Sequence, residues 1–399
     1  MFLAIVVIVL YILRAACYRL YFHPLHSFPG PKLAAITSLY EFYYAVVKDG
    51  QFIWELGRLH DKYGPIVRIT PDELRIRDSS FYNEIYAGGT RVREKSSSFV
   101  RLFGAPDSTV ATVLSKYFSK RSVLNMQPLI QGKIDALIQH FRKAHREQRV
   151  INLSIAFSAL TADIISTYAY SVWIVQMRCI SSNVMEKIFL PAARVIKVQE
   201  SLGQQANDEG YILLTAGTET SSWALSVTIF YLLSNKQFLL RLHEELKLAM
   251  PKPNHVPDLS ELETLPLLRA VIKEGLQLSF GVLTRLPRVA PFEALNYKGH
   301  LIPPGTPVSQ SIYFVNMDPR HFPEPHTFNP DRWLGTAEER KALESMLVSF
   351  SRGSRQSELF LTLATLVRRF DLKLVDTTLD DVEPYRDHFI ISPKNRNGI

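Results

Sequence analysis

The sequence contains very little cysteine: Cys17 and Cys179 are the only two among its 399 residues. Two thiols exclude a disulfide framework and any metal site built from several cysteines. Clustered charge is missing as well, because no run of five Lys and Arg residues occurs and the net charge of +8 is spread along the chain. This distribution argues against a nucleic-acid-binding protein and favours a membrane surface or an acidic partner.

The composition also lacks the marks of a non-globular chain. Charged residues make up 21% and hydrophobic residues 47%, which excludes a disordered, collagen-like or coiled-coil protein. No internal repeat or low-complexity tract occurs. The length allows one large domain or two ordinary ones.

An apolar segment opens the chain. Residues 2–13 carry no charge, and Arg14 interrupts the apolar stretch that continues to about residue 22. Twelve residues are short for a span of about 20, but an arginine near the end of a span can reach the lipid headgroups. Basic residues follow the run and none precedes it, which places the rest of the chain in the cytosol. We therefore expect a membrane anchor at residues 1–22, with a cleaved secretory signal as the alternative.

Three prolines, Pro24, Pro29 and Pro31, follow the anchor. Because proline fixes φ and restricts the residue before it, residues 23–36 are expected to form a stiff hinge. The remaining residues, 37–399, are expected to fold as one domain.

Hydrophobic periodicity predicts that this domain is mainly α with a small β part. Alternating residues on either side of Pro71 predict a hairpin. Further short strands are expected within 285–308 and at 372–375 and 389–391, and a long proline-rich meander at 316–333. Helices are expected at 130–146, 153–170, 211–233, 236–250, 265–278 and 357–370.

The helix expected at 211–233 contains an unusual polar centre, Ala216-Gly217-Thr-Glu219-Thr220. Glycine and a hydroxyl that bonds back to the preceding turn both loosen a helix locally. An acid beside a hydroxyl in an apolar helix could relay protons to a bound molecule. The alternative is a kinked core helix with a solvated glutamate.

Three further polar segments follow. Glu274 and Gln277 are three residues apart, so they share one face of the helix at 265–278. Arg332 lies in Phe328-Asn-Pro-Asp-Arg-Trp333, and Phe350, Gly353 and Arg355 lie in a glycine- and arginine-containing segment before the last helix. Each segment alone is a weak signal.

Their order and spacing together resemble the cytochrome P-450 family of haem-thiolate monooxygenases, in the microsomal form of fungal secondary metabolism. The resemblance implies that Thr220, with Glu219, serves the dioxygen proton relay, and that Ala216 and Gly217 form the kink beside the haem. It further implies a buried structural network of Glu274, Gln277 and Arg332. The haem-binding residues that it implies are Arg285, Arg288, Phe350, Gly353 and Arg355.

The chain departs from the family pattern at three places. Ser357 stands where the family has the cysteine that ligates iron, and about eight residues of the ligand loop are missing before Glu358. A serine hydroxyl is not deprotonated near neutral pH, and Cys179 lies far upstream, so no metal ligand is predicted. Gln277 replaces the arginine of the family's Glu-x-x-Arg helix. No basic residue precedes Lys116 in 105–116, where relatives bind a haem propionate.

The resemblance implies oxidation of an apolar secondary metabolite, a terpenoid or polyketide intermediate, with haem as cofactor. NADPH would supply electrons through a membrane-bound cytochrome P-450 reductase, which would dock on a basic face near Arg368 and Arg369. The expected location is the endoplasmic reticulum membrane, with one span and a cytosolic body. Because the ligand cysteine is missing, we expect impaired activity. The alternatives are a non-catalytic, membrane-anchored binding protein and a mis-spliced reading frame.

Overall fold

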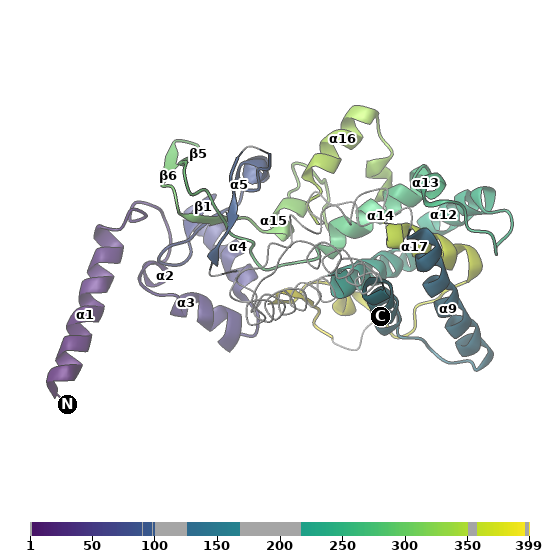
Figure 1. Ribbon diagram of the computed structural model, residues 1–399, viewed down its shortest axis with the longest axis horizontal. Helices are drawn as coiled ribbons and strands as arrows, with labels where there is room; N and C mark the ends of the chain where they lie inside the picture. The colour runs from purple at the N-terminus through teal and green to yellow at the C-terminus, as the bar shows by residue number, and fades with distance from the viewer. Residues whose placement is uncertain are drawn as a thin grey trace, which may run out of the picture. The chain divides into compact units, whose positions relative to one another are not determined.

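The computed structural model describes residues 2–89, 91–97, 99, 126–167, 217–349, 357–395 and 399. The chain forms two compact units, each assembled from segments that are distant in the sequence (Figure 1). Unit 1 comprises residues 1–102, 282–323 and 384–394, and unit 2 comprises residues 103–281, 324–383 and 395–399. The described chain is mainly helical with a small β part, as the sequence predicted.

Unit 1 begins with a long exposed helix, α1 (Phe2–Tyr21). It has 20 residues, is largely apolar, and none of its residues is buried, so by length and composition α1 can cross a membrane. The proline-rich segment that follows packs onto unit 1, because Leu25 and Phe28 are buried in its core. The helices α2 (Lys32–Ile36), α3 (Leu39–Phe42) and α4 (Phe52–Tyr63) come next, with a π-helical turn, η1 (Tyr43–Val47), between α3 and α4.

A five-stranded sheet organises unit 1, in the order β1-β2-β7-β4-β3. The predicted hairpin is confirmed, since β1 (Ile66–Arg68) pairs antiparallel with β2 (Leu74–Ile76). β2 pairs parallel with β7, and β4 pairs antiparallel with both β7 and β3. The other strands of the sheet are β3 (Glu94–Lys95), β4 (Arg288–Val289) and β7 (Pro307–Ser309).

Alternation along the strands gives this sheet two buried faces. Leu74 and Ile76 pack with Val308 in one apolar cluster. Val67 packs in a second cluster with residues of α4, such as Leu56. Around the sheet lie η2 (Ser79–Phe81), α5 (Tyr82–Ile85), α15 (Ile312–Asn316) and the two hairpins β5 (Leu295–Tyr297) with β6 (His300–Ile302) and β8 (Arg386–His388) with β9 (Ile390–Ser392).

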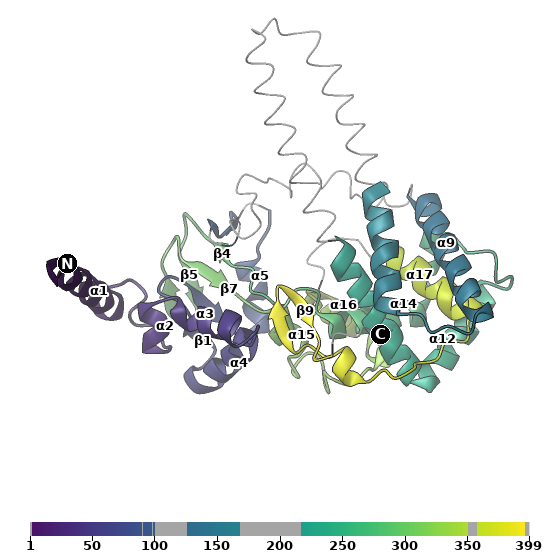
Figure 2. The same ribbon diagram turned by 90° about the horizontal axis from the view of Figure 1, so that it is seen from below.

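Unit 2 is helical, and its centre is α17 (Ser357–Arg369), which is buried from Ser357 to Val367. Packed on α17 are α9 (Gln127–Arg146), α12 (Lys236–Ala249), α13 (Leu259–Leu262) and α14 (Pro266–Ser279), as Figure 2 shows for several of them. Two further helices cover Leu153–Thr167 and residues 217–234. The shorter elements are η4 (Pro330–Trp333), α16 (Ala337–Met346) and η5 (Leu379–Asp381).

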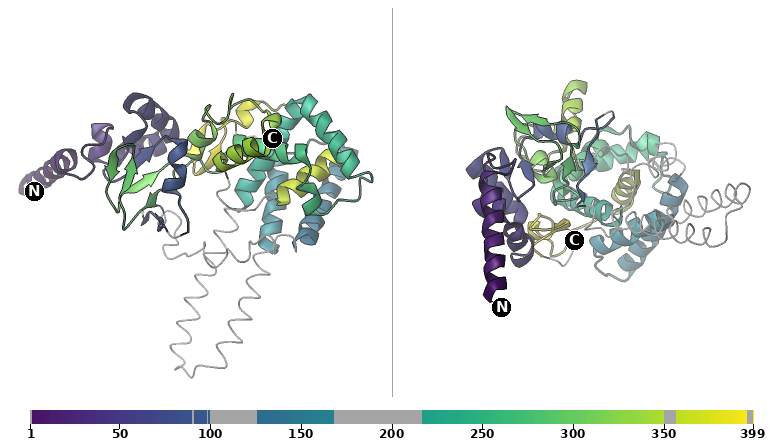
Figure 3. Two further views of the ribbon diagram at one scale, coloured as in Figure 1. Left: turned by 90° about the horizontal axis from the view of Figure 1, so that it is seen from above. Right: turned by 60° about the vertical axis from the view of Figure 1, so that its left-hand side comes forward.

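A close helix crossing in unit 2 depends on glycine. A Cβ atom at Gly275 of α14 would overlap the side chain of Thr228 in the helix at 217–234. Glycine therefore lets the backbones of these two helices approach. Figure 3 gives two further views of the chain, coloured by residue number.

The predicted helices are found with small shifts at their ends, within the described residues. One strand prediction was wrong, because residues 372–375 form no strand. Asp371, Lys373 and Asp376 interrupt this short apolar run, and no neighbouring strand offers it a partner among the described residues.

Candidate functional site

Glu274 is the centre of a buried polar network in unit 2. Its side chain is on α14 and has no solvent exposure. The Nε atom of Arg332 lies 3.1 Å from Glu274 Oε2 and 3.2 Å from Oε1. The Nε1 atom of Trp333 donates to Oε2 over 2.7 Å, and the backbone N–H of Asn329 donates to Oε1 over 2.7 Å. Each carboxylate oxygen therefore has more than one donor.

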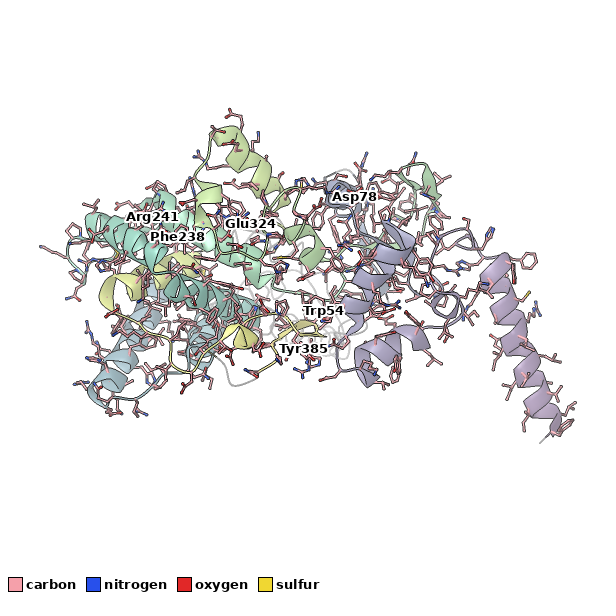
Figure 4. All side chains as sticks on the ribbon, turned by 180° about the vertical axis from the view of Figure 1, so that it is seen from behind. Trp54, Asp78, Phe238, Arg241, Glu324 and Tyr385 are labelled. Carbon is pink, nitrogen blue, oxygen red and sulfur yellow. The ribbon has the colours of Figure 1, made fainter. Side chains whose placement is uncertain are left out.

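The local sequence explains why these donors converge. The Asn329 side chain accepts a hydrogen bond from the backbone N–H of Asp331 and so caps η4, which begins at Pro330. The Arg241 guanidinium binds both oxygens of Asp331, at 2.8 and 2.9 Å. Arg241 also lies over the ring of Phe238, and both are labelled on α12 in Figure 4. The meander is thereby fixed to α12.

Burial dominates the electrostatics of Glu274. Loss of hydration disfavours the charged carboxylate, and Arg332 and the two other donors offset only part of that effect. The result is a pKa of Glu274 raised to about 7.

Gln277 faces the same meander, as its spacing from Glu274 predicted. Its side chain is fully buried, and its Nε2 atom donates to the backbone carbonyl of Pro325 over 3.0 Å. Arg332 also donates to the carbonyl of Thr327, over 3.2 Å. Glu274 and Arg332 thus form one network, and Gln277 contacts the same meander at Pro325.

The part of the suggested proton-relay segment that the structure describes lies on the helix at 217–234. Within residues 217–234, Gly217 is buried, Glu219 is exposed and Thr220 is half-buried. A Cβ atom at Gly217 would overlap Ile165, so glycine allows this helix to lie close to the one at Leu153–Thr167. Ala216 lies outside the described residues.

Unit 1 contains the two arginines expected near a haem propionate. The Arg285 guanidinium lies between two carboxylates: Nε is 2.8 Å from Glu73 Oε1, and Nη1 is 2.5 Å from Glu41 Oε1. Both carboxylates raise the pKa of Arg285 against the opposing effect of burial. Arg288 is on β4, with its guanidinium over the ring of Tyr86.

Ser357 is the first residue of α17 and is 7% exposed, and Glu358 follows it inside the same helix. Phe350, Gly353 and Arg355, which the resemblance assigned to haem, lie outside the described residues, as do Cys179 and residues 105–116. Sequence reasoning gave no role to Trp333, Asn329, Glu41 and Glu73. Trp333 and Asn329 lie in the same short motif as Arg332, so the motif could have indicated that they contact Glu274 as well.

Comparison with known proteins gives the family. The cytochrome P-450 family profile matches residues 204–397. Conidiogenone synthase PchP450 of Penicillium rubens is 39% identical over 468 aligned positions, which cover 96% of this chain and 94% of that protein. This chain belongs to the cytochrome P-450 family. Cytochrome P-450 monooxygenase TRI4 of Trichoderma arundinaceum is 37% identical, with 99% and 93% covered, and cytochrome P-450 monooxygenase aflU of Aspergillus parasiticus is 36% identical, with 94% and 93% covered.

The alignment to the Penicillium cytochrome P-450 extends over 468 positions although this chain has only 399 residues. The relative therefore contains residues without a counterpart here, while nearly the whole of this chain still aligns. This pattern agrees with internal gaps in an otherwise recognisable cytochrome P-450 sequence.

The family implies a haem, and the donor set does not fit a haem thiolate. Ser357, where the resemblance places the ligand, lies in the first turn of a buried helix. Cys17 is the free cysteine of the described chain, and it lies exposed in α1. No group of three or more His, Cys, Asp and Glu side chains that could hold a metal ion is found in the part of the chain that the structure describes.

The two arginines expected at a reductase-docking face are engaged within unit 2. Arg368 donates to the carbonyl of Met250 over 2.9 Å, and Arg369 donates to the carbonyl of Pro253 over 2.7 Å. The Arg369 side chain is only 8% exposed. These contacts give both arginines a structural role at the end of α12.

Proposed function

We propose that this chain derives from haem monooxygenases that oxidise apolar secondary metabolites of the terpenoid or polyketide class, and that it lacks their activity. The family and the named monooxygenase relatives support the first part. The observation that carries the second part is Ser357 at the start of α17, directly followed by Glu358. A thiolate tunes haem iron for oxygen cleavage, and a neutral serine hydroxyl does not replace it.

We propose the roles of the other site residues from their positions in the family motifs. Glu219 and Thr220, on the helix at 217–234, would hold and deliver a proton in an enzyme that has the ligand loop. Arg285 and Arg288 would contact haem propionates in an intact relative, and NADPH would act through a reductase. α1 would span the endoplasmic reticulum membrane once, with residues 37–399 in the cytosol as one domain.

The test is the carbon monoxide difference spectrum of the reduced, full-length protein, with haem content measured on the same sample. We expect no thiolate-type band from the natural sequence or from Ser357→Cys, because the substitution does not restore the missing loop. Replacing Ser357 by the complete ligand loop of the Penicillium relative is the matched gain-of-function variant, and it should produce the band. A thiolate band from the natural protein, or from Ser357→Cys alone, would contradict the proposal.

The alternative is a non-catalytic, membrane-anchored binding protein. The buried Glu274–Arg332 ion pair and the buried helix α17 favour it, because a packed helical core could bind a ligand without haem. Thermal unfolding in the presence of apolar terpenoids would detect such binding without haem. A ligand-dependent rise in Tm in the absence of a haem spectrum supports this alternative.

A mis-spliced reading frame is tested separately by sequencing full-length transcripts. A transcript that encodes a cysteine-containing loop between Gln356 and Glu358 would show that the monooxygenase is made from the same locus. Transcripts that all join Gln356-Ser357-Glu358 would leave the chain as a true degenerate relative.

A further inference from the structure

The exposed side of α9 carries surplus positive charge near its C-terminal end. From residue 139 to residue 149 every exposed side chain is polar, and four are Lys or Arg against a single acid, Glu147. That acid lies 2.7 Å from the Nη2 atom of Arg149. Three cations remain on the last two turns of α9, which lies at the surface of unit 2 in Figure 1. We call them the α9 patch, and they are Arg142, Lys143 and Arg146.

The three side chains of the α9 patch are neighbours on one face. Arg146 follows Arg142 by four residues and Lys143 by three, and residues at these spacings meet on a helix surface. Like charges at such spacings oppose helix formation. The opposite face of α9 is buried, with Ile138 and Phe141 among its residues, and α9 packs on α17. The helix therefore cannot rotate to separate the patch from solvent.

The acids near the α9 patch are bound to other cations. Asp135 Oδ1 lies 3.4 Å from the Nη1 atom of Arg369, and Asp163 Oδ2 lies 3.8 Å from the Nζ atom of Lys133. Glu147 is already paired. Within the described residues no acid forms an ion pair with the α9 patch. The patch therefore keeps its full positive charge in the folded chain.

The helix dipole does not account for this charge. The carbonyl end of a helix carries about half an elementary negative charge, and its effect is confined to the last turn. The α9 patch has three full positive charges. Most of its charge is therefore available to an anionic partner.

The residues of α9 also indicate which class of anion fits. Guanidinium groups bind carboxylates through two parallel hydrogen bonds. A helix that lies in a lipid surface inserts an apolar face, whereas the apolar face of α9 is buried in unit 2. Nucleic-acid binding is disfavoured by the even spread of charge along the chain. An acidic protein surface is the partner that remains.

We propose that the α9 patch docks an acidic protein segment, whose Asp and Glu side chains pair with Arg142, Lys143 and Arg146. Docking at this surface requires neither haem nor electron transfer. The proposal therefore goes beyond the monooxygenase origin of the chain and does not depend on it.

The experiment measures the binding of a fluorescent oligoglutamate peptide to the full-length chain in phosphatidylcholine nanodiscs, by fluorescence anisotropy. The patch variant is Arg142→Gln with Lys143→Gln and Arg146→Gln. The matched control removes the same number of charges from exposed lysines elsewhere in unit 2. It consists of Lys236→Gln, Lys252→Gln and Lys341→Gln.

We expect the patch variant to bind the peptide about tenfold more weakly than the natural chain, because three exposed ion pairs are lost. The control variant should bind about twofold more weakly at most, since salt screens distant charges. The peptide should also slow amide hydrogen exchange at residues 139–149 of the natural chain. Equal weakening in the two variants, or no binding to the natural chain, would overturn the proposal.

Two further measurements address the other roles that the α9 patch could have. Without peptide, the patch variant should have a Tm at or above that of the natural chain, because repulsion between its cations is removed. A Tm below that of the control variant would show that the cations serve to stabilise α9, and would overturn the docking site. Slower exchange at residues 139–149 in phosphatidylserine nanodiscs without peptide would identify lipid as the partner and would equally overturn it.

Discussion

The indole Nε1 of Trp333 donates to the carboxylate of Glu274 over 2.7 Å, on the oxygen that also faces Arg332. In the family pattern this carboxylate would face a second arginine, at the position of Gln277. Here Gln277 bonds to the carbonyl of Pro325 and brings no charge. Glu274 is therefore a buried acid with one cation, which explains why burial still raises its pKa.

Gln277→Arg should stabilise the protein above neutral pH. A second cation lowers the pKa of Glu274 from about 7 toward its ordinary value of 4.5, which is worth at most about 3 kcal/mol. Urea unfolding at pH 8 measures the gain, and Gln237→Arg on the exposed face of α12 is the control. If Gln277→Arg and Gln237→Arg raised the free energy of unfolding equally, the missing second cation at Glu274 would not be the cause.

The contribution of Glu274 to the free energy of unfolding should fall as pH rises from about 4.5 to about 7. The folded pKa of Glu274 lies above its unfolded value, so its contribution is fully present below the unfolded pKa and is lost as pH rises through the folded one. Glu274→Gln should remove this component of the slope, although it lowers stability at every pH. The free energy of unfolding is measured for both proteins at several pH values. If its slope against pH is the same in Glu274→Gln as in the natural chain, Glu274 is not the source of the slope.

Trp333→Phe should cost about 1.5–3 kcal/mol, because it removes a hydrogen bond to a charged, buried acceptor. Trp54→Phe is the matched control. Its indole donates to the carbonyl of Tyr385 in a solvent-accessible position, and Figure 4 shows both residues. We expect less than about 1 kcal/mol there. Equal losses of unfolding free energy in the two variants would show that burial and charge do not strengthen the Trp333 hydrogen bond.

Arg285→Met should destabilise the protein by about 3–5 kcal/mol, because it leaves the carboxylates of Glu41 and Glu73 without their shared cation. Arg91→Met breaks a surface pair with Glu84 and should cost less than about 1 kcal/mol. Thermal unfolding of the two variants compares them directly. Partial rescue of Arg285→Met by Glu41→Gln would confirm that the loss is electrostatic.

Asn152 should remain unglycosylated in cells. It begins an Asn-Leu-Ser sequon, and its side chain accepts the N–H of Ile155 at a helix start. Only lumenal enzymes modify such a sequon, whereas the basic flank of α1 predicts a cytosolic body. A sequon on a polar extension ahead of Phe2 is the positive control. If endoglycosidase treatment shifted the electrophoretic mobility of the natural chain, the body would lie in the lumen, opposite to this prediction.

The sequence predicted the helices of unit 2 well, because each has an apolar face with helical spacing, as α9 shows with Ile130, Ile134 and Leu137. It also predicted that Glu274 and Gln277 face one partner, since i and i+3 share a helix face. Short strands were harder. The run at 372–375 has the right composition, but a strand also needs a neighbour, and that depends on tertiary structure.

The candidate site was predictable only where a motif contained its own partners. Arg332 and Trp333 lie in the same short segment as Asn329, so the network could be read from one stretch of sequence. The partners of Arg285 could not, because Glu41 and Glu73 lie more than two hundred residues upstream. Long-range ion pairs of this kind leave no local pattern.

The contacts of Arg368 and Arg369 with the carbonyls that follow α12 fix the far end of α17. Since α17 is also buried along most of its length, it cannot slide along its axis to compensate for residues lost ahead of Ser357. A transplanted ligand loop would therefore join a helix, α17, whose position is already fixed by its packing. Restoring the iron ligand therefore becomes a local graft of one loop, with no change to the position of α17.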